Sequence, residues 1–314
     1  MATRAETLGR VKVFRTAKRK RGRLHQSNLT AYLMIAPMVV LLSIFVLYPL
    51  GYAVYLSGYR ISFYKGNQWV GLDFYRYVLD DPRFWASVRV GFKYVAMTVP
   101  TMIILAFLLA SLIRSLSGWM ATVLKTTVYV PAVLSSVIAS VVFVFIYQDQ
   151  GVANWFVGLF GIGPVAWLND PGVSLAAIAA PGVWLGFGIS TLILLAAMLD
   201  IPQSYYESAS LDGAGFFRKS RYITIPLLRN VFLFLIVTGV VLTLQEFLLP
   251  LIMTGGGPVD ATNTPNLFIF NSFRDFTPYA TSFSLAASLI LFAVLGAVSL
   301  LIFKAVNSVK AVDG

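Results

Sequence analysis

Six long apolar runs, separated by polar segments, dominate the pattern of residues along the chain. The runs cover residues 31–56, 92–113, 124–147, 175–199, 227–253 and 283–303. Each is close to the roughly 20 residues that an α-helix needs to cross the hydrocarbon core of a bilayer. The runs are continuous and do not alternate with polar residues, so helices, not strands, must satisfy the backbone polar groups in lipid. The pattern predicts an all-α integral membrane protein with six transmembrane helices.

The composition of the chain agrees with a membrane protein and excludes most kinds of catalytic site. Hydrophobic residues make up 58% of the 314 positions and charged residues 12%. There is no cysteine and only one histidine, His25, so thiolate metal sites, cysteine nucleophiles and histidine-based triads lack their residues. No stretch reads G-x-x-x-x-G-K-[ST], so any ATP must bind to another polypeptide. We expect a non-catalytic chain that binds no metal or cofactor itself.

Basic residues are distributed unequally between the two sides of the predicted membrane domain. Residues 1–28 contain nine Lys or Arg and one acid, Glu6. With six spans, 17 of the 24 Lys and Arg fall on the side of the termini. Because positive loops stay in the cytoplasm, both termini are predicted to be cytoplasmic. The net charge of +11 then indicates a membrane surface and no nucleic acid, with a basic tail (1–28) preceding one six-span domain (29–314).

A polar and basic segment, residues 200–226, separates the fourth and fifth spans. Within it, Ser204 and Glu207 fit a capping box, which predicts a short helix that starts at Ser204. Asp212-Gly213 is a turn dipeptide, and Gly213 can adopt the positive φ that ends a helix. Helical turns are expected between Phe216 and Pro226, which gives a bent helical hairpin. The cap residues alone are equally compatible with an ordinary capped loop.

The full spacing of this segment resembles a known signature. Glu207, Ala209 and Gly213 form E-x-A-x-x-x-G, nine residues follow, and Ile223 then opens the sequence I-T-I-P, which ends at Pro226. The signature loop of bacterial ABC importer permeases reads E-A-A-x-x-x-G, nine residues, then I-x-L-P. One Ser and one Ile depart from that form, both conservatively. The sequences of residues 31–57, 69–81, 167–214 and 251–258 also look like landmarks of carbohydrate-type permeases.

This resemblance implies a type I ABC importer permease fold in a prokaryotic inner membrane. It implies a second homologous permease, ATPase subunits that hold ATP and Mg, an extracytoplasmic solute-binding protein and surrounding lipid as partners. The solute would be a sugar, oligosaccharide, polyol or sugar phosphate. The cytoplasmic hairpin would couple to the ATPase, through residues Glu207, Ala209, Asp212, Gly213, Arg218, Ile223 and Pro226. The alternatives are a permease for another solute and, with less support, an ion-coupled transporter.

Polar and aromatic residues within the spans are candidates for the substrate pathway. An acid at the centre of a span costs about 2.5 to 3.5 kcal/mol, so Gln245 and Glu246 require an explanation. Glu246 can line the pathway or pair with a polar group on a neighbouring helix. Trp184 and Phe187 offer faces for sugar rings, although aromatic residues in spans also serve packing. Related permeases often have Asp or Asn at the position of Leu248, which a helix would place about 200° from Glu246.

Overall fold

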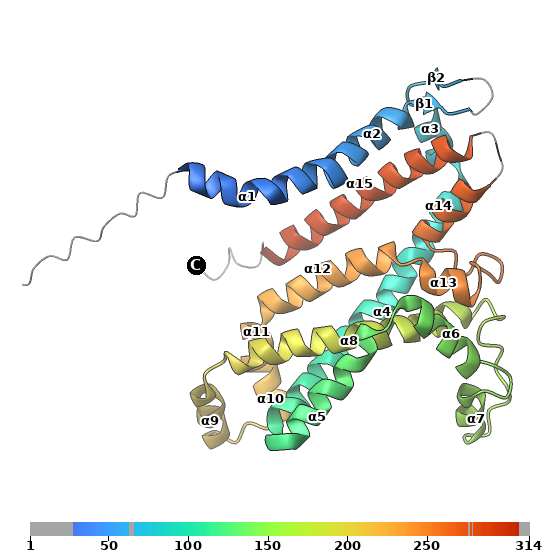
Figure 1. Cartoon of the computed structure of the whole chain (residues 1–314). Helices are drawn as coiled ribbons and strands as arrows, with labels where there is room; N and C mark the ends of the chain where they lie inside the picture. Colours follow the sequence, from blue (N-terminus) through green and yellow to red (C-terminus); the bar gives the residue numbers. More distant parts are fainter. Residues whose placement is uncertain (1–27, 63–65, 276, 278, 308–314) are drawn as a thin grey trace, which may run out of the picture. The chain divides into compact units, whose positions relative to one another are not determined.

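The computed structural model describes residues 28–62, 66–275, 277 and 279–307, and most of these are helical (Figure 1). The basic tail predicted from residue 1 therefore lies almost entirely outside the described residues. The chain divides into two units, Met1–Tyr52 and Ala53–Gly314. The first predicted span consists of α1 (Asn28–Leu42), a π-helical turn η1 (Ser43–Leu47) and α2 (Tyr48–Ser57).

The second unit carries the other spans and their connections. Its elements are β1 (Tyr59–Arg60), β2 (Gln68–Trp69), α3 (Asp73–Asp80), α4 (Pro82–Ser115), α5 (Gly118–Tyr129), η2 (Val130–Val133), α6 (Ser136–Ile146), α7 (Val152–Gly158), α8 (Ser174–Leu199), α9 (Gln203–Leu211), α10 (Phe216–Lys219), η3 (Ser220–Thr224), α11 (Ile225–Leu227), α12 (Arg229–Gln245), α13 (Leu248–Met253), α14 (Pro265–Arg274) and α15 (Ala280–Asn307). The two short strands pair antiparallel, Tyr59 with Trp69 and Arg60 with Gln68.

Five helical segments of the described chain are long and apolar enough to cross a membrane. They are Ala31–Ser57, Pro82–Ser115, Ser174–Leu199, Arg229–Met253 and Ala280–Lys304. A bent helix pair, Gly118–Val133 with Ser136–Ile146, makes a sixth when it is counted as one span. The all-α membrane class and the number of spans predicted from the apolar runs are confirmed on this count.

The third span is not the continuous helix that its apolar run predicts. Its two halves meet at 98°, around the short 3₁₀ segment that contains Pro131. Proline lacks a backbone N–H and its ring clashes with the preceding helical turn, so it ends α5. The second half then starts afresh, with the Ser135 hydroxyl accepting a hydrogen bond from the Ile138 N–H at 3.3 Å. Hydropathy does not change at this bend, which is why the run appears unbroken.

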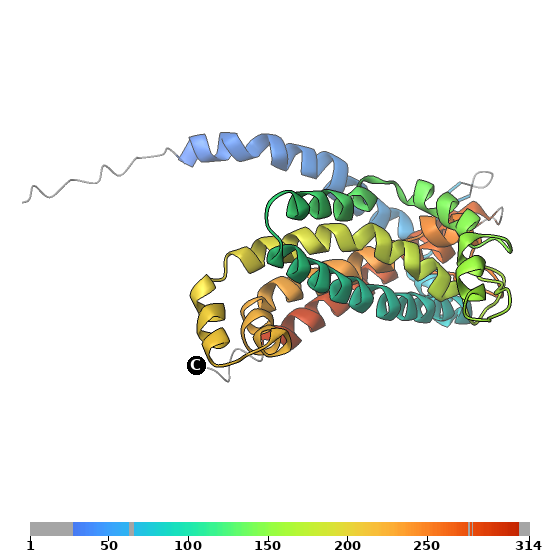
Figure 2. The ribbon, with the colours of Figure 1, turned by 90° about the horizontal axis from the view of Figure 1, so that it is seen from below.

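The core of the second unit lies along α4 and α8, with α12 and α15 packed around them (Figures 1 and 2). Small residues permit this close packing. Ala106 and Ala110 of α4 are fully buried. A Cβ on Gly186 would lie 2.5 Å from the Met102 sulfur, and one on Gly188 would overlap the Val128 carbonyl oxygen. Both glycines are therefore packing contacts.

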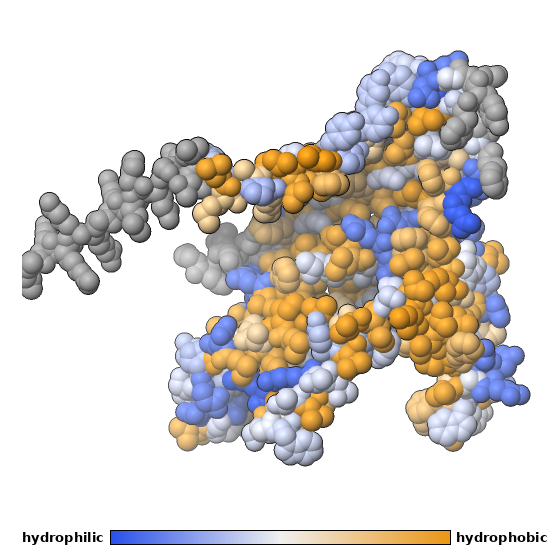
Figure 3. All heavy atoms as spheres, in the orientation of Figure 1, coloured by the Kyte–Doolittle hydropathy of each residue, from blue (hydrophilic) through white to orange (hydrophobic). Residues whose placement is uncertain are grey.

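The spans have two distinct ends. The hairpin of α9 and α10 follows the end of α8 and precedes α12, and it lies at one end of the bundle (Figure 1). We call this the hairpin end. The connection α7, the break before α13 and the helix α14 lie at the opposite end (Figure 1). In Figure 3, polar surface gathers over the hairpin and at the opposite end of the bundle, whereas apolar residues cover much of the spans between them.

Candidate functional site

The first helix of the hairpin does not begin with a capping box. It starts at Gln203, one residue earlier than predicted, and no side chain caps it. Pro202 is extended (φ −55°, ψ 131°), and its carbonyl accepts a hydrogen bond from the Tyr205 N–H at 3.2 Å. Helical geometry therefore begins directly after the proline, and Ser204 lies inside the first turn. The predicted capping box of Ser204 and Glu207 is wrong, and the Glu207 side chain is exposed to solvent.

The turn between the two arms has the predicted glycine geometry. Gly213 has φ +72°, which a residue with a Cβ adopts only at a cost. Its N–H donates to the Ser210 carbonyl at 3.0 Å, and the Ala214 N–H donates to the Ala209 carbonyl at 2.9 Å. These bonds satisfy carbonyl groups that the helix end leaves open. Asp212 immediately precedes the reversal, and α10 then starts at Phe216.

The second arm is helical through Pro226, with a π-helical turn from Ser220 to Thr224. Two side-chain contacts join it to the first arm. The hydroxyls of Tyr206 and Thr224 lie 3.0 Å apart, and the Lys219 ammonium donates to the Ser210 hydroxyl at 2.7 Å. The side chain of Ile223 packs against the core of the spans. The hairpin is thus one folded unit attached to the bundle.

An arginine at the end of α4 connects the hairpin to a span. The Arg114 guanidinium lies 3.9 Å from the centre of the Tyr206 ring, a cation–π contact. Its Nη2 also lies 3.5 Å from the Gln203 amide oxygen. A cavity of about 240 Å³ surrounds these groups, lined by Ser111, Arg114, Ser115, Met198, Gln203, Tyr206, Phe216, Lys219, Ser220 and Thr224. Sequence reasoning missed Arg114 and Tyr206, although a lone arginine at a span end is a usable signal.

The outer surface of the hairpin exposes both large apolar side chains and charged side chains. Leu211 and Phe217 are 90% and 85% exposed. Tyr205 and Tyr222 are also exposed, as is Arg218. Large apolar side chains that gather on an exposed segment mark a protein-contact surface. The residues predicted for coupling therefore divide into exposed positions (Glu207, Asp212, Arg218, Pro226), the turn at Gly213, and the half-buried Ala209 and Ile223.

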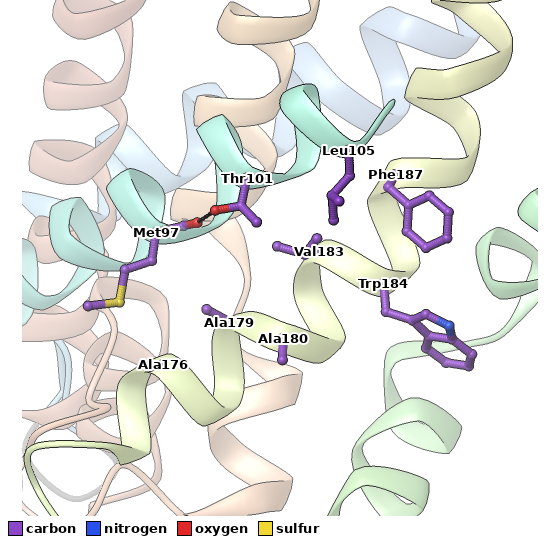
Figure 4. Close-up of a pocket in the computed structure, with 9 residues that line it drawn as sticks. All are labelled: Met97, Thr101, Leu105, Ala176, Ala179, Ala180, Val183, Trp184 and Phe187. Atoms are coloured by element: carbon purple, nitrogen blue, oxygen red, sulfur yellow. Dashed lines mark hydrogen bonds between the residues drawn. The ribbon is translucent and has the colours of Figure 1, made fainter. Parts of the chain in front are cut away.

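Two of the four predicted pathway residues share an apolar cavity between α4 and α8. It has a volume of about 530 Å³ and is lined by Met97, Thr101, Leu105, Ala176, Ala179, Ala180, Val183, Trp184 and Phe187 (Figure 4). The Trp184 ring also packs at 5.7 Å from the Phe143 ring of α6. The only hydroxyl in the lining, that of Thr101, donates to the Met97 carbonyl of its own helix. The cavity is thus mainly apolar, and the Trp184 indole is the other polar group in its lining.

A second cavity is more polar and lies where α4, α6, α8 and α12 meet. It has a volume of about 400 Å³. Its polar lining residues are Tyr94, Thr98, Ser136, Ser190, Thr238, Thr243 and Glu246. Gly182 belongs to the same lining, and a Cβ there would lie 2.6 Å from the Tyr94 hydroxyl. Of the predicted pathway residues, only Glu246 lines this cavity. Sequence reasoning missed the Ser and Thr hydroxyls, although their spacing along each span could have indicated a shared face.

Glu246 lies at a break between two helices. It follows the last residue of α12, and its Oε1 accepts hydrogen bonds from the Leu248 and Leu249 N–H groups at 2.8 and 3.1 Å. The carboxylate therefore caps α13, as anions do at helix N-termini. The expected 200° separation from Leu248 is wrong because no single helix contains both residues. The Gln245 side chain is exposed, and its carbonyl accepts from Asn266 at 2.7 Å.

The family described as binding-protein-dependent transport system inner membrane component matches residues 83–309, and the chain belongs to it. The chain is 33% identical over 247 residues to the trehalose/maltose transport system permease protein MalF of Thermococcus litoralis, covering 77% of this chain and 83% of that protein. It is 32% identical over 245 residues to the sulfoquinovosyl glycerol transport system permease protein SmoG of Agrobacterium fabrum, covering 77% and 79%.

A solved structure shares the fold. It is that of a bacterial alginate ABC transporter in complex with an alginate pentasaccharide-bound periplasmic protein. The match has a TM-score of 0.73 and 20% identity, and covers 90% of this chain and 93% of that chain. The chain is thus an inner-membrane permease component of a binding-protein-dependent transport system, with the ABC importer permease fold that the signature loop implied.

Proposed function

We propose that this chain is one half of the translocation gate of an ATP-driven importer for a sugar, oligosaccharide, polyol or sugar phosphate. The observation that carries the proposal is the hairpin, which joins a glycine-ended first helix to a surface of exposed apolar and charged residues. Its attachment to α4 through Arg114 gives that surface a mechanical path to the spans. ATP and Mg would be held by separate ATPase subunits that dock on this surface.

The direction of coupling follows from the placement of α4. At the hairpin end, α4 meets Tyr206 through Arg114, and further along it contributes Tyr94 and Thr98 to the polar cavity. Closure of the ATPase subunits would move the hairpin, and the cation–π contact would transmit that movement to α4. Alternating access requires such a link between hydrolysis and the arrangement of the spans. With the hairpin in the cytoplasm, the opposite end of the bundle faces the solute-binding protein.

The polar cavity supports a hydroxyl-rich solute. Its lining includes the ring of Tyr94 and the hydroxyls of Thr98 and Thr243. The hydroxyls of Ser190 and Thr238 also line it, and because they donate to the Gly186 and Phe234 carbonyls of their own helices, they can only accept a hydrogen bond from a solute. Hydroxyl groups donate and accept hydrogen bonds, so they suit the hydroxyls of a sugar, and an aromatic face suits its apolar ring surface. The related permeases bear the names of trehalose/maltose and sulfoquinovosyl glycerol systems. A second homologous permease would complete the pathway, since one chain supplies only one wall.

Reconstitution tests this proposal directly. The chain would be placed in liposomes with a second permease and an ATPase of the same transport system, and the binding protein would be added outside. We expect ATP hydrolysis to rise on addition of sugar-loaded binding protein, and labelled sugar to accumulate only with ATP. Stimulation by a non-carbohydrate solute alone would assign the same machine another cargo. Uptake driven by an ion gradient without the ATPase would overturn the proposal.

A further inference from the structure

The short helix α7 presents its apolar face away from the protein. Val152, Trp155, Phe156, Leu159 and Phe160 follow the helical spacing i, i+3, i+4, i+7, i+8. The first three lie on one face of α7, and Leu159 and Phe160 follow in the turn that ends it. All five are between 55% and 69% exposed. A surface helix of a soluble domain turns such a stripe toward the core. Here the apolar stripe faces away from the protein, so lipid or another protein must cover it.

A buried asparagine holds α7 in this inverted orientation. Asn154 is 7% exposed. Its Nδ2 donates to the carbonyls of Gln148 and Val165 at 3.3 and 3.2 Å, and its Oδ1 accepts from the Val165 N–H and the Trp167 indole at 2.9 and 3.0 Å. Both ends of the amide are satisfied, so the polar face of α7 points inward by specific bonds. These hydrogen bonds therefore keep the apolar stripe on the outside of the protein.

The same bonds connect α7 rigidly to the neighbouring spans. The Trp167 ring stacks on the Tyr147 ring at 5.5 Å and 27°. The Tyr147 hydroxyl donates to the Ala177 carbonyl of α8 at 2.9 Å. Tyr147 itself follows the last residue of α6. A force on α7 is thus transmitted to the ends of both α6 and α8.

The position and charge of the stripe indicate lipid as its occupant. The segment 148–173 leaves α6 and enters α8 at the same end of the bundle, and α7 lies crosswise to α8 (Figure 1). A helix in this place would lie along the membrane surface, where interfacial helices bury Trp, Phe and Leu side chains. The segment contains no Lys or Arg, so attraction to anionic headgroups is not needed. The five stripe residues include no charge, whereas interfaces with releasable protein partners carry a polar rim.

We propose that α7 with Leu159 and Phe160 is an interfacial anchor, inserted among the lipid acyl chains just below the headgroups of the leaflet opposite the hairpin. Its apolar stripe contacts the acyl chains, while Asn154 fixes its orientation. The anchor holds the adjacent ends of α6 and α8 at one depth, so that conformational change is concentrated toward the hairpin end. This anchoring does not depend on which solute is carried.

The absence of cysteine makes a direct test possible. Single variants Phe160→Cys and Asn169→Cys would be spin-labelled in the full chain in nanodiscs, and collisions with oxygen and with a water-soluble nickel chelate would be compared. Asn169 is the matched control, since it is an exposed polar residue of the same segment. We expect the label at 160 to favour oxygen several-fold, the label at 169 to favour nickel, and neither result to change between neutral and anionic lipid.

Other results would contradict the anchor. A label at 160 that collides freely with nickel lies in water. A label that becomes shielded only when the binding protein or the second permease is added lies on a protein-docking surface. In a second variant, Asn154→Ala, we expect the label at 160 to stay in lipid but to show greater motion, because the amide bonds are lost. Unchanged motion would show that Asn154 does not fix the helix.

Discussion

At the scale of single residues, Gly213 illustrates how backbone geometry decides what the hairpin can tolerate. A Cβ at this position would meet no atom within 4 Å. Its requirement is therefore conformational and not steric, because φ is +72°. Gly215, two residues later, also has open space around it but a φ of −75°. The two glycines therefore differ in φ, which decides whether a residue with a Cβ fits without strain.

Gly213→Ala is expected to disturb the turn, whereas Gly215→Ala is not. A left-handed conformation costs an L-residue about 1 to 2 kcal/mol. We expect Gly213→Ala to insert normally but to lower association with the ATPase roughly five-fold or more, as such a cost implies at 1.4 kcal/mol per factor of ten. Co-purification of the ATPase measures it. Equal losses in both variants would show that the loop is sensitive to any side chain and that φ is not the cause.

Substitutions of Glu207 and Ser204 distinguish an effect on ATPase docking from an effect on the stability of α9. Because neither caps α9, removing either side chain should leave the hairpin folded, in contrast to the roughly 1 kcal/mol that loss of a true cap costs. We expect Glu207→Ala to weaken ATPase association and Ser204→Ala to leave it unchanged. Thermal unfolding in detergent should be unaltered by both. A lowered unfolding temperature for Ser204→Ala would restore the capping box.

At the scale of elements, the sequence predicted the features that depend on local properties and missed those that depend on breaks in the helices. The apolar runs and the Asp212-Gly213 dipeptide were sufficient for the spans and the turn, because hydropathy and positive φ are local properties. The bend at Pro131 was missed because the residues on both sides are equally apolar. The start of α9 was misplaced because Pro202 fixes the backbone one residue before Ser204. The role of Glu246 as a cap depends on a break in the helix that composition does not indicate.

The contact between Arg114 and Tyr206 joins an element of the hairpin to an element of the pathway. Tyr206→Leu removes both the ring under the guanidinium and the hydroxyl near Thr224, whereas Tyr206→Phe removes the hydroxyl alone. A cation–π contact contributes about 0.5 to 2 kcal/mol. We expect Tyr206→Leu to lower the sugar transported per ATP hydrolysed several-fold and Tyr206→Phe to change it little. Uptake and hydrolysis are measured in the same liposomes.

That experiment separates coupling from docking. If Tyr206→Leu lowers hydrolysis and uptake in equal proportion, the contact serves assembly with the ATPase and not transmission to α4. If Tyr206→Phe is as impaired as Tyr206→Leu, the hydroxyl contact with Thr224 is the essential one. Either result would remove the cation–π contact from the coupling path.

At the scale of the whole molecule, the charge asymmetry of the chain predicts that the hairpin lies in the cytoplasm. The exposed Phe217 is a suitable probe of this side, whereas Ser220 is buried. We expect an impermeant thiol reagent outside right-side-out vesicles to label Asn169→Cys and to leave Phe217→Cys unlabelled until the membrane is opened. External labelling of Phe217→Cys would invert the topology, and with it the side from which the ATPase acts.

The two cavities beside α4 also belong to this scale, since each is assembled from more than one span and one has the more polar lining. Thr98 lines the polar cavity and is 3% exposed, and its hydroxyl has no hydrogen-bond partner among the described residues. Thr101 lines the apolar cavity less than one turn away, and its hydroxyl donates to the Met97 carbonyl. The two threonines form a matched pair on one helix.

Thr98→Val tests whether the polar cavity is the sugar pathway. An unsatisfied buried hydroxyl costs about 1 to 3 kcal/mol, so its replacement by a methyl group of similar shape should leave stability unchanged or increase it. A solute that pairs with this hydroxyl would lose a hydrogen bond, for which we expect uptake to fall several-fold at equal protein abundance. Thr101→Val should leave uptake near the wild-type rate. If Thr101→Val lowers uptake and Thr98→Val does not, the solute passes along the face of Trp184 and Phe187, and the hydroxyl-lined cavity has no part in the pathway.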